Sequence, residues 1–184
     1  GYFKWSGFSL IDIDEEDDFQ LARSVINLKT KEYVKPKFFK SKNNLIFDSN
    51  VKQILAKDGV LNNNQESFNK MIVDITKIIN KKPKNKSWSH TLVNSDSNSA
   101  TLIAQLPGEG NRMHFHPDWN EWWLILKGKW EWNIEGEKKI INKNELIYID
   151  KNKKHKITAV GKGLSIRLAV SRYDVEHVYT ENDF

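Results

Sequence analysis

The sequence predicts a mainly β protein: a small double-sheet barrel or sandwich that carries an α-helical N-terminal region. Three observations lead to this prediction. From Trp88 onward, short apolar strands alternate with turn residues at even spacing. Before that point, apolar residues recur with the period of an amphipathic helix. The length of 184 residues suits one domain with an appendage, because compact domains usually hold about 100 to 150 residues.

Helical periodicity marks three segments of the N-terminal half. Segment 14–28 begins with Asp14 as an N-cap and has acidic residues in its first turn, and its apolar residues share one side of a helix. A Lys-rich stretch around Pro36 follows and is expected to be extended. A short helix fits 49–59 and ends at a glycine. The strongest signal covers 64–82, where six apolar residues fall at helical spacing.

Short strands separated by turn residues fill the rest of the chain. They are expected at 87–94, 100–107, 112–117, 121–136, 138–142, 145–150, 155–160 and 164–172. The sequence contains no internal repeat and no Gly/Ser linker that would separate the helical half as an independent module. We therefore expect residues 1–90 to form a helical and extended region packed on a β-barrel domain of residues 91–184.

Composition excludes several classes of protein. The formal charge of +5 arises from lysines spread through turns and tails, so no basic stripe for nucleic acid is expected. No apolar run approaches the roughly 20 residues of a membrane helix, and the first residues lack the order of a secretory signal, which predicts a cytoplasmic protein. With no cysteine in the chain, any metal site must use nitrogen and oxygen ligands.

The stretch "HFHPDWNEWW", residues 114–123, carries the clearest chemistry. Side chains alternate along a strand, so His114 and His116 project to the same side. After a turn, a returning strand carries Glu121 beside them, and a later strand can bring His155 to the same place across a barrel. Three imidazoles and one carboxylate without a thiolate suit Fe(II), Mn(II), Ni(II), Co(II) or Zn(II). Two positions of an octahedral ion would stay open to substrate or dioxygen.

The segment "GNRMHFHPDWNEWWLILKG" resembles the first motif of the cupin superfamily, in which glycine, His-x-His, Glu and glycine follow one another. The segment "NELIYIDKNKKH" resembles the second cupin motif, with Asn144, Asp150 and Asn152 where the family usually has Gly, Pro and Gly. Asn and Asp tolerate the left-handed turn conformations that glycine supplies, so these substitutions are mild. The closing histidine of that motif is His155. The resemblance covers roughly residues 96–172 and says little about residues 1–90.

That resemblance implies a cupin double-stranded β-helix, which is a jelly-roll barrel, with one divalent transition metal at its centre. The implied ligands are His114, His116, Glu121 and His155, and Fe(II) is the favoured ion. The same stretch is also similar to 3-hydroxyanthranilate dioxygenases, which carry an arginine four residues before a ligand histidine and an aromatic tract at the ligand glutamate. This chain differs from them by the extra His114 and by Ala159 where a second arginine is wanted. The substrate of those enzymes is therefore not transferred.

Aromatic residues and arginines near the motif are further candidates for the site. If Glu121 points into the barrel, strand alternation predicts that Trp123 does so too and can wall the metal cavity. The alternative is that most of the tryptophans only cover a sheet, the helical region or a dimer interface. Arg112 falls on the face of the two histidines and can hold a carboxylate or phosphate, and Arg167 is either a second anion clamp or a solvent-facing residue. Tyr148 can reach the cavity as an acid, base or hydrogen-bond donor, or simply pack.

Two other histidines are expected to be structural. His90 lies on a predicted strand among Ser and Thr, and His177 lies in the C-terminal tail, where it caps or packs.

Function must be argued from the site, because cupins host many reactions. The first hypothesis is a metal-dependent enzyme for a small, anionic organic substrate, most simply a non-haem Fe(II) oxygenase. The second is a sugar or hydroxy-acid isomerase, epimerase or lyase that uses the metal as a Lewis acid. The third is a non-catalytic ligand-binding cupin. Exposed aromatic positions also predict a homodimer.

Overall fold

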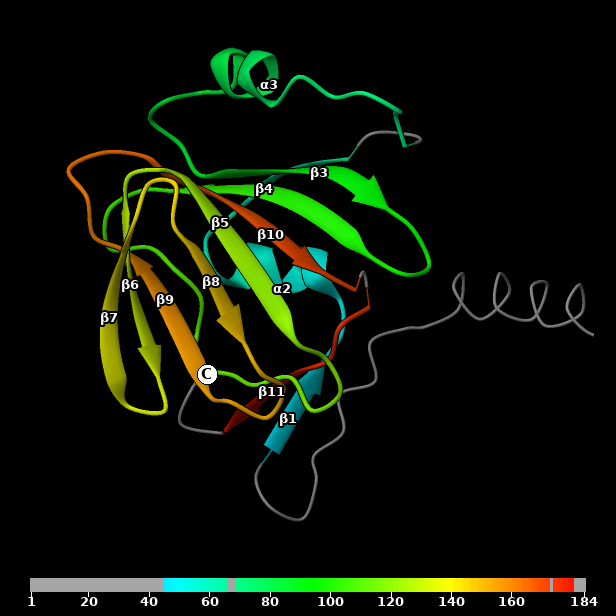
Figure 1. Ribbon diagram of the computed structural model, residues 1–184, viewed down its shortest axis with the longest axis vertical. Coiled ribbons are helices and arrows are strands. Elements are labelled where there is room, and N and C mark those ends of the chain that lie inside the picture. Colours follow the sequence, from blue (N-terminus) through cyan, green and yellow to red (C-terminus); the bar gives the residue numbers. More distant parts are fainter. Residues whose placement is uncertain (1–44, 66–68, 173, 181–184) are drawn as a thin grey trace, which may run out of the picture. The chain divides into compact units, whose positions relative to one another are not determined.

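The computed structural model describes residues 45–65, 69–172 and 174–180, which all belong to the compact unit Phe38–Phe184 (Figure 1). The two described α-helices are α2 (Val51–Lys57) and α3 (Ile75–Lys81). The described strands are β1 (Leu45–Asp48), β2 (Asn62–Gln65), β3 (Trp88–Asn94), β4 (Ser99–Gln105), β5 (Glu121–Lys127), β6 (Lys129–Ile134), β7 (Glu137–Asn142), β8 (Leu146–Ile149), β9 (His155–Ala159), β10 (Ser165–Ser171) and β11 (His177–Thr180).

These strands form two main sheets and a small third one. The larger sheet has the order β2-β3-β4-β10-β5-β8, the second has the order β7-β6-β9, and β1 pairs with β11 (Figure 1). The consecutive strands β5 and β6 lie in different sheets, as do β9 and β10. The chain therefore passes back and forth between two sheets, which produces the double-sheet β-barrel that the strand spacing predicts.

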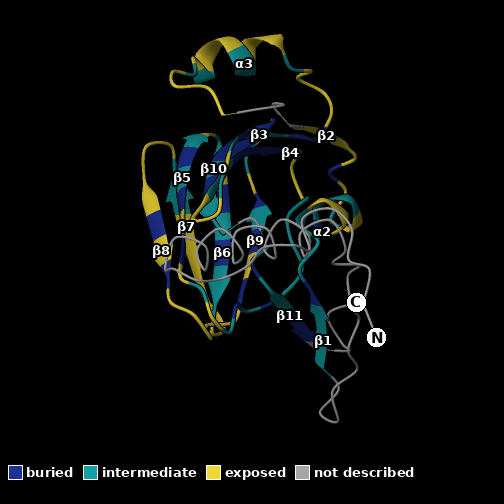
Figure 2. Cartoon of the chain, turned by 90° about the vertical axis from the view of Figure 1, so that its right-hand side faces the viewer, coloured by how far each residue is buried: buried dark blue, intermediate teal, exposed yellow. Residues whose placement is uncertain are grey.

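The main core lies between the two sheets. Trp123 and Ile125 of β5 meet Trp130 and Trp132 of β6 and Ile157 of β9 there, and the last four are fully buried. Each large apolar side chain buried in this way contributes roughly 1.5–3 kcal/mol relative to an exposed one. In Figure 2 the strands of the barrel are coloured mainly as buried or intermediate, whereas α3 is largely exposed. The inward direction of Trp123 thus follows the prediction from the sequence, and the structure adds that Trp130 and Trp132 of β6 face the same core.

A second core covers the other face of the larger sheet. Leu92 of β3 and Leu102 of β4 pack there with Trp88 and Ile166. The isoleucines of α3 contact this cluster, so this helix packs on the outside of the barrel.

The helix predicted at 49–59 is confirmed as α2, whose N-cap Asn50 accepts a hydrogen bond from the Gln53 backbone. The prediction of one helix over 64–82 is wrong in length. The helix begins only after Asp74, whose side chain accepts a hydrogen bond from the Lys77 backbone at 2.9 Å and so caps the chain at that point. Met71 is 99% exposed, so the first part of the predicted stripe does not join the core.

The strand predicted at 112–117 is replaced by two isolated bridges. His114 pairs with His155, and the next residue, Phe115, pairs with Val178 of β11. Because neighbouring residues pair with different partners, no continuous ladder forms. The sequence reasoning did not anticipate β1, β2 or β11, since all three are short and polar in part.

Of the other expectations for the N-terminal half, two concern residues that the structure does not describe, and one concerns the domain boundary at residue 90. The helix predicted at 14–28 and the extended stretch around Pro36 lie outside the described residues. Strand β3 runs across the proposed boundary at residue 90, and β2 pairs with it in parallel. Among the helices of the described segments, none is long and apolar enough to cross a membrane.

Candidate metal centre

The four ligands expected from the sequence meet at one point inside the barrel. One ligand atom from each of His114, His116, Glu121 and His155 lies within 4.8 Å of all the others, and all four residues are buried. Glu121 is the first residue of β5 and His155 the first of β9. The backbones of His114 and His155 exchange two hydrogen bonds of 3.0 and 2.8 Å, which fixes these two imidazoles side by side.

The Nδ1 atoms of the three imidazoles all contact backbone carbonyls. Each Nδ1 lies at 2.7 to 2.9 Å from a backbone carbonyl, which belongs to Arg112 for His114, to Glu176 for His116 and to Lys153 for His155. A carbonyl only accepts hydrogen bonds, so each Nδ1 carries the proton and each Nε2 presents a lone pair. Metal-binding histidines are held in this way in proteins.

The Nε2 atoms of His116 and His155 face the oxygens of Glu121. The Nε2 atom of His155 lies 2.7 Å from Oε1 of Glu121, and the Nε2 atom of His116 lies 3.4 Å from Oε2. Both Nε2 atoms and Oε1 are buried, and no described residue offers any of them a hydrogen bond. Lone pairs that face one another repel, and a proton or a metal cation between them removes the repulsion. The donor set therefore fits a divalent transition metal, although it does not distinguish one ion from another.

The side chains of the cluster shift one another's pKa values. Burial alone raises the pKa of Glu121, but the imidazoles of His116 and His155 outweigh burial and hold this pKa well below its usual range. Burial lowers the pKa of His116, and the Glu121 carboxylate more than reverses the effect, so that this pKa is raised. Burial, with a smaller contribution from His155, keeps the pKa of His114 well below its ordinary value. A carboxylate anion and a neutral His114 therefore face the centre at neutral pH.

Turn residues next to the cluster adopt the conformations expected for them. Asn144 and Asn152 have positive φ angles of 70° and 63°. The backbone of Asn152 donates a hydrogen bond of 2.7 Å to the carbonyl of His116. Asparagine thus adopts the left-handed conformation at both turns, and the hydrogen bond of Asn152 connects the turn before β9 with the candidate ligand His116.

Gly110 lies against the backbone of β9. A Cβ atom built on it would lie 1.8 Å from the carbonyl oxygen of Ile157, so only glycine fits at this contact. The close approach brings the segment that carries His114 onto the strand that carries His155.

Strand β11 contributes to the centre, and the sequence reasoning missed this role. The carbonyl of Glu176, directly before β11, orients His116. The ring of His177 stacks on His114 at 4.7 Å between centroids and contacts His116 at 4.4 Å. Tyr179 follows on the same side of the strand, 5.6 Å from His114. The available signal was the alternation in "HVYT", which places His177 and Tyr179 together.

Arg112 does not project freely beside the two histidines. Its Nε donates a hydrogen bond of 2.7 Å to Asp58 at the end of α2, and its guanidinium lies 4.5 Å from the ring centre of Tyr179. Asp58 is nearly inaccessible, with a side chain that is 2% exposed. This ion pair connects α2 with the segment of the metal ligands, and a role of Arg112 in holding substrate stays a prediction.

Arg167 is buried inside the barrel and is not solvent-facing. Its guanidinium lies 5.0 Å from the ring centre of Trp123 and 4.2 Å from that of Trp130, and its Nη1 donates a hydrogen bond of 2.6 Å to Gln105. Burial lowers the pKa of Arg167 to about 9, so the side chain remains cationic at neutral pH. Trp123 packs against Trp132 at 5.7 Å between ring centroids.

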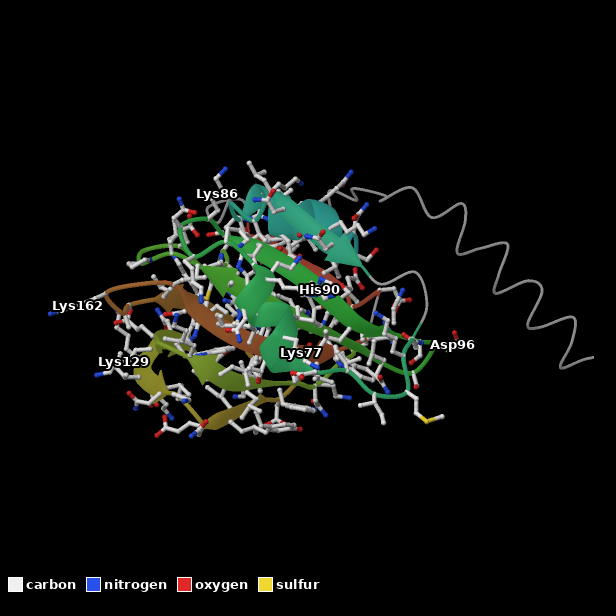
Figure 3. All side chains as sticks on the ribbon, turned by 90° about the horizontal axis from the view of Figure 1, so that it is seen from above. Lys77, Lys86, His90, Asp96, Lys129 and Lys162 are labelled. Carbon is white, nitrogen blue, oxygen red and sulfur yellow. The ribbon has the colours of Figure 1, made fainter. Side chains whose placement is uncertain are left out.

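Two other candidates lie elsewhere. Tyr148 is 54% exposed on the outer face of β8, and its hydroxyl donates to Asp150 at 2.9 Å. The structure thus does not bring Tyr148 to the cluster. His90 lies on β3, in the larger sheet (Figure 3), and is not part of the cluster.

Comparisons with known proteins agree with this architecture. Residues 101–171 match the family model described as a cupin domain. No curated protein matches the sequence. A solved structure of a protein with a double-stranded β-helix domain from Klebsiella pneumoniae subsp. pneumoniae MGH 78578 has a TM-score of 0.51 at 14% identity, and the match covers 60% of this chain and 90% of that one.

Two further solved structures have lower scores. A cupin superfamily protein from Desulfitobacterium hafniense DCB-2 has a TM-score of 0.48 at 19% identity, with 58% of this chain and 95% of that chain covered. A polyketide cyclase from Streptomyces resistomycificus has a TM-score of 0.47 at 18% identity, with 55% and 75% covered. The family match spans β4 to β10 and includes all four clustered residues, and the first of the three structures shares the fold. The β-barrel of this chain therefore has the cupin double-stranded β-helix fold, and its residues 101–171 match the cupin domain model.

Proposed function

We propose that the protein is a metal-dependent enzyme that acts on a small anionic organic molecule, most simply as a non-haem Fe(II) oxygenase. One observation carries the proposal: three imidazoles, each with its Nδ1 against a backbone carbonyl, gather with a buried carboxylate so that one ligand atom of each lies within 4.8 Å of the others, and two of the Nε2 atoms face the Glu121 oxygens. This arrangement is costly without a cation and favourable with one.

The residues of the chain have distinct parts in this proposal. His114, His116, Glu121 and His155 would hold one divalent ion, and such an ion binds substrate oxygens and activates dioxygen or polarises a carbonyl. The Glu121 carboxylate offsets part of the charge of the ion. The buried tryptophans exclude bulk water, which strengthens every electrostatic interaction in the site. Arg167 supplies a fixed positive charge that favours an anionic substrate.

Metal content tests the first part of the proposal. Protein purified without chelator is expected to contain close to one equivalent of Fe, Mn, Ni, Co or Zn per chain, measured by elemental analysis. Glu121→Gln and His116→Ala should lower that content at least tenfold, because each removes a ligand from a buried site. Tyr148→Phe is the matched control, since Tyr148 lies on the outer face, and it should retain the metal. Unchanged content in the ligand variants would exclude these residues as ligands.

Oxygen consumption tests the second part. The Fe(II)-loaded protein is screened with small organic acids in an oxygen electrode, and consumption that depends on both iron and Glu121 supports an oxygenase. Conversion of a sugar or hydroxy acid without oxygen uptake would favour an isomerase, epimerase or lyase at the same centre. Tight binding of an acid without conversion would favour a non-catalytic cupin.

A further inference from the structure

We propose that the interior of the barrel beside the metal cluster binds the carboxylate of a small acid through Arg167 and the indole N–H groups of Trp123, Trp130 and Trp132. The inference rests on the proposed metal centre and names the class of molecule that the centre takes. That class is a dicarboxylate, with one carboxylate for these donors and the second for the metal.

The side chain of Arg167 is buried, and only part of its hydrogen-bonding capacity is used. The residue is 1% exposed, and Gln105 satisfies its Nη1. Its Nε is also buried, yet no described residue accepts a hydrogen bond from it. The faces of Trp123 and Trp130 hold the guanidinium in place. A buried cationic donor without an acceptor is costly, which favours an oxyanion as its missing partner.

The indoles of the main core offer further hydrogen-bond donors. The Nε1 atoms of Trp123, Trp130 and Trp132 are all buried, and no described residue accepts a hydrogen bond from any of them. The indole of Trp88, in the second core, instead donates to the carbonyl of Pro83 at 3.2 Å. The main core thus contains several donors that lack acceptors, and polar tips of buried tryptophans usually find partners.

The tryptophans and Arg167 lie close to the metal cluster. Trp132 lies 6.2 Å from the ring of His155 and 5.7 Å from the ring of Trp123, and Trp123 in turn contacts Arg167. The side chains that carry the unpartnered donors therefore contact one another in succession, starting at the candidate metal ligand His155. One molecule can contact both the metal and the donors only if its oxygen groups are separated along this succession of side chains.

The buried charged side chains near the cluster balance one another. Inside the barrel, the negative charge of Glu121 is matched by the positive charge of Arg167, and Asp58 is matched by Arg112. A divalent cation at the cluster would then leave its own charge uncompensated in surroundings of low dielectric constant. A doubly negative ligand restores the balance, which a neutral sugar does not.

The inference is tested with the full chain loaded with Zn(II), which binds oxygen ligands without redox turnover. Oxalate, malonate, succinate and glutarate are titrated by calorimetry, and zinc content is measured for each variant. We expect one chain length to bind best. Arg167→Lys should weaken this binding roughly tenfold or more, because it removes the planar donor set but keeps the charge. Trp130→Phe and Trp132→Phe should each weaken binding roughly threefold to tenfold.

The control and the possible outcomes separate this inference from the proposed function. Trp88→Phe removes an indole N–H outside the main core and should leave binding unchanged. Trp132→Phe removes the indole N–H and keeps an aromatic ring at this buried position, as Trp88→Phe does in the second core, so the test remains decisive if Arg167→Lys does not fold. Zinc-loaded protein that binds none of the acids, or binds them equally well in Trp132→Phe and Trp130→Phe, overturns the inference but not the metal centre. Failure to bind zinc overturns both.

Discussion

The imidazoles of the metal cluster differ in the charges that surround them, and this difference predicts how metal binding depends on pH. The raised pKa of His116 means that the metal-free protein retains a proton there above pH 6.5, the ordinary value. That proton stabilises the metal-free fold below pH 6.5, and the stabilisation is lost as the pH rises through the raised pKa. Metal must displace the same proton, so binding strengthens with rising pH.

The melting temperature of metal-loaded protein minus that of metal-free protein should therefore increase from pH 6 to pH 8. The depressed pKa of His114 destabilises both forms below about pH 6.5 and does not change this difference. Calorimetric scans of both forms across this range, with Zn(II) as the ion, provide the measurement. A difference that is constant or decreases with pH contradicts the assigned ligand set.

Arg112 and Asp58 give a second prediction at the scale of residues. Burial is the largest influence on Asp58 and raises its pKa, while the bond to Arg112 opposes the rise. In Arg112→Met the carboxylate loses this partner, and we expect a loss of about 2 kcal/mol in the free energy of unfolding at pH 7. The loss should shrink toward pH 5, because the unpaired carboxyl then takes up a proton in the folded state.

Denaturant titrations of Arg112→Met, Asp58→Asn and the double variant measure this coupling. The double variant should be more stable than the sum of the single losses predicts. Additive losses would show that the pair contributes nothing of its own.

At the scale of elements, β11 is the strand on which the metal centre depends most directly. Its backbone exchanges two hydrogen bonds with Phe115, between the two ligand histidines, and the preceding carbonyl orients His116. Val178→Pro removes the N–H that donates to Phe115 at 2.9 Å. We expect Zn(II) affinity to fall at least tenfold in this variant, measured by competition with a chromophoric chelator, because His116 loses its fixed orientation.

Val178→Ala is the control for that substitution, since it keeps the backbone donor and shortens the side chain. It should cost stability through lost packing but retain most of the metal affinity. Equal metal affinity in Val178→Pro and the wild type would mean that β11 only covers the centre.

Substitutions of Asn152, in the turn before β9, are expected to affect stability more than metal binding. Asn152 is held at a φ of 63°, where glycine is comfortable and a β-branched residue is strained. Asn152→Gly should change stability by less than about 1 kcal/mol and keep the metal, whereas Asn152→Val should destabilise by roughly 1–3 kcal/mol. Thermal unfolding of the two variants checks the order, and a more stable valine variant would contradict the turn geometry.

At the scale of the whole molecule, the outer face of β5 and β8 makes self-association the expected state. Trp122 pairs across the strands with Tyr148, and Leu124 pairs with Leu146. Of these, Trp122, Tyr148 and Leu146 are 36%, 54% and 57% exposed. Strand β8 is also the edge of the larger sheet. We expect a homodimer through this apolar face, since exposed apolar faces of this kind commonly mark interfaces.

Light scattering coupled to size-exclusion chromatography tests the oligomeric state. Leu146→Glu combined with Tyr148→Glu should convert the dimer into a monomer that still binds metal, because neither side chain faces the centre. Ile140→Glu, which introduces a charge at another exposed position on β7, should remain dimeric. A monomeric wild-type protein would make this prediction wrong.

Local rules made much of the fold predictable. Alternation along β5 placed Trp123 on the same inward face as Glu121, because residues two apart in a strand share a face. That Trp130 and Trp132 of β6 also face the core was decided by the structure. The same rule placed His114 and His116 together even though their segment forms only isolated bridges. Helix 64–82 was predicted too long, since periodicity does not reveal where a capping side chain such as Asp74 starts the helix.

What the sequence determined by itself was the β-barrel class, the four residues of the candidate metal cluster and the inward face of β5. These depend on spacing and alternation, which are properties of neighbouring residues. Only the tertiary structure decided that Arg167 is buried between two tryptophans, that Asp58 engages Arg112, and that β11 orients a ligand. Each of these depends on contacts between residues far apart in the chain. Such contacts arise when the sheets close on each other, and no local pattern encodes which distant partner a side chain will meet.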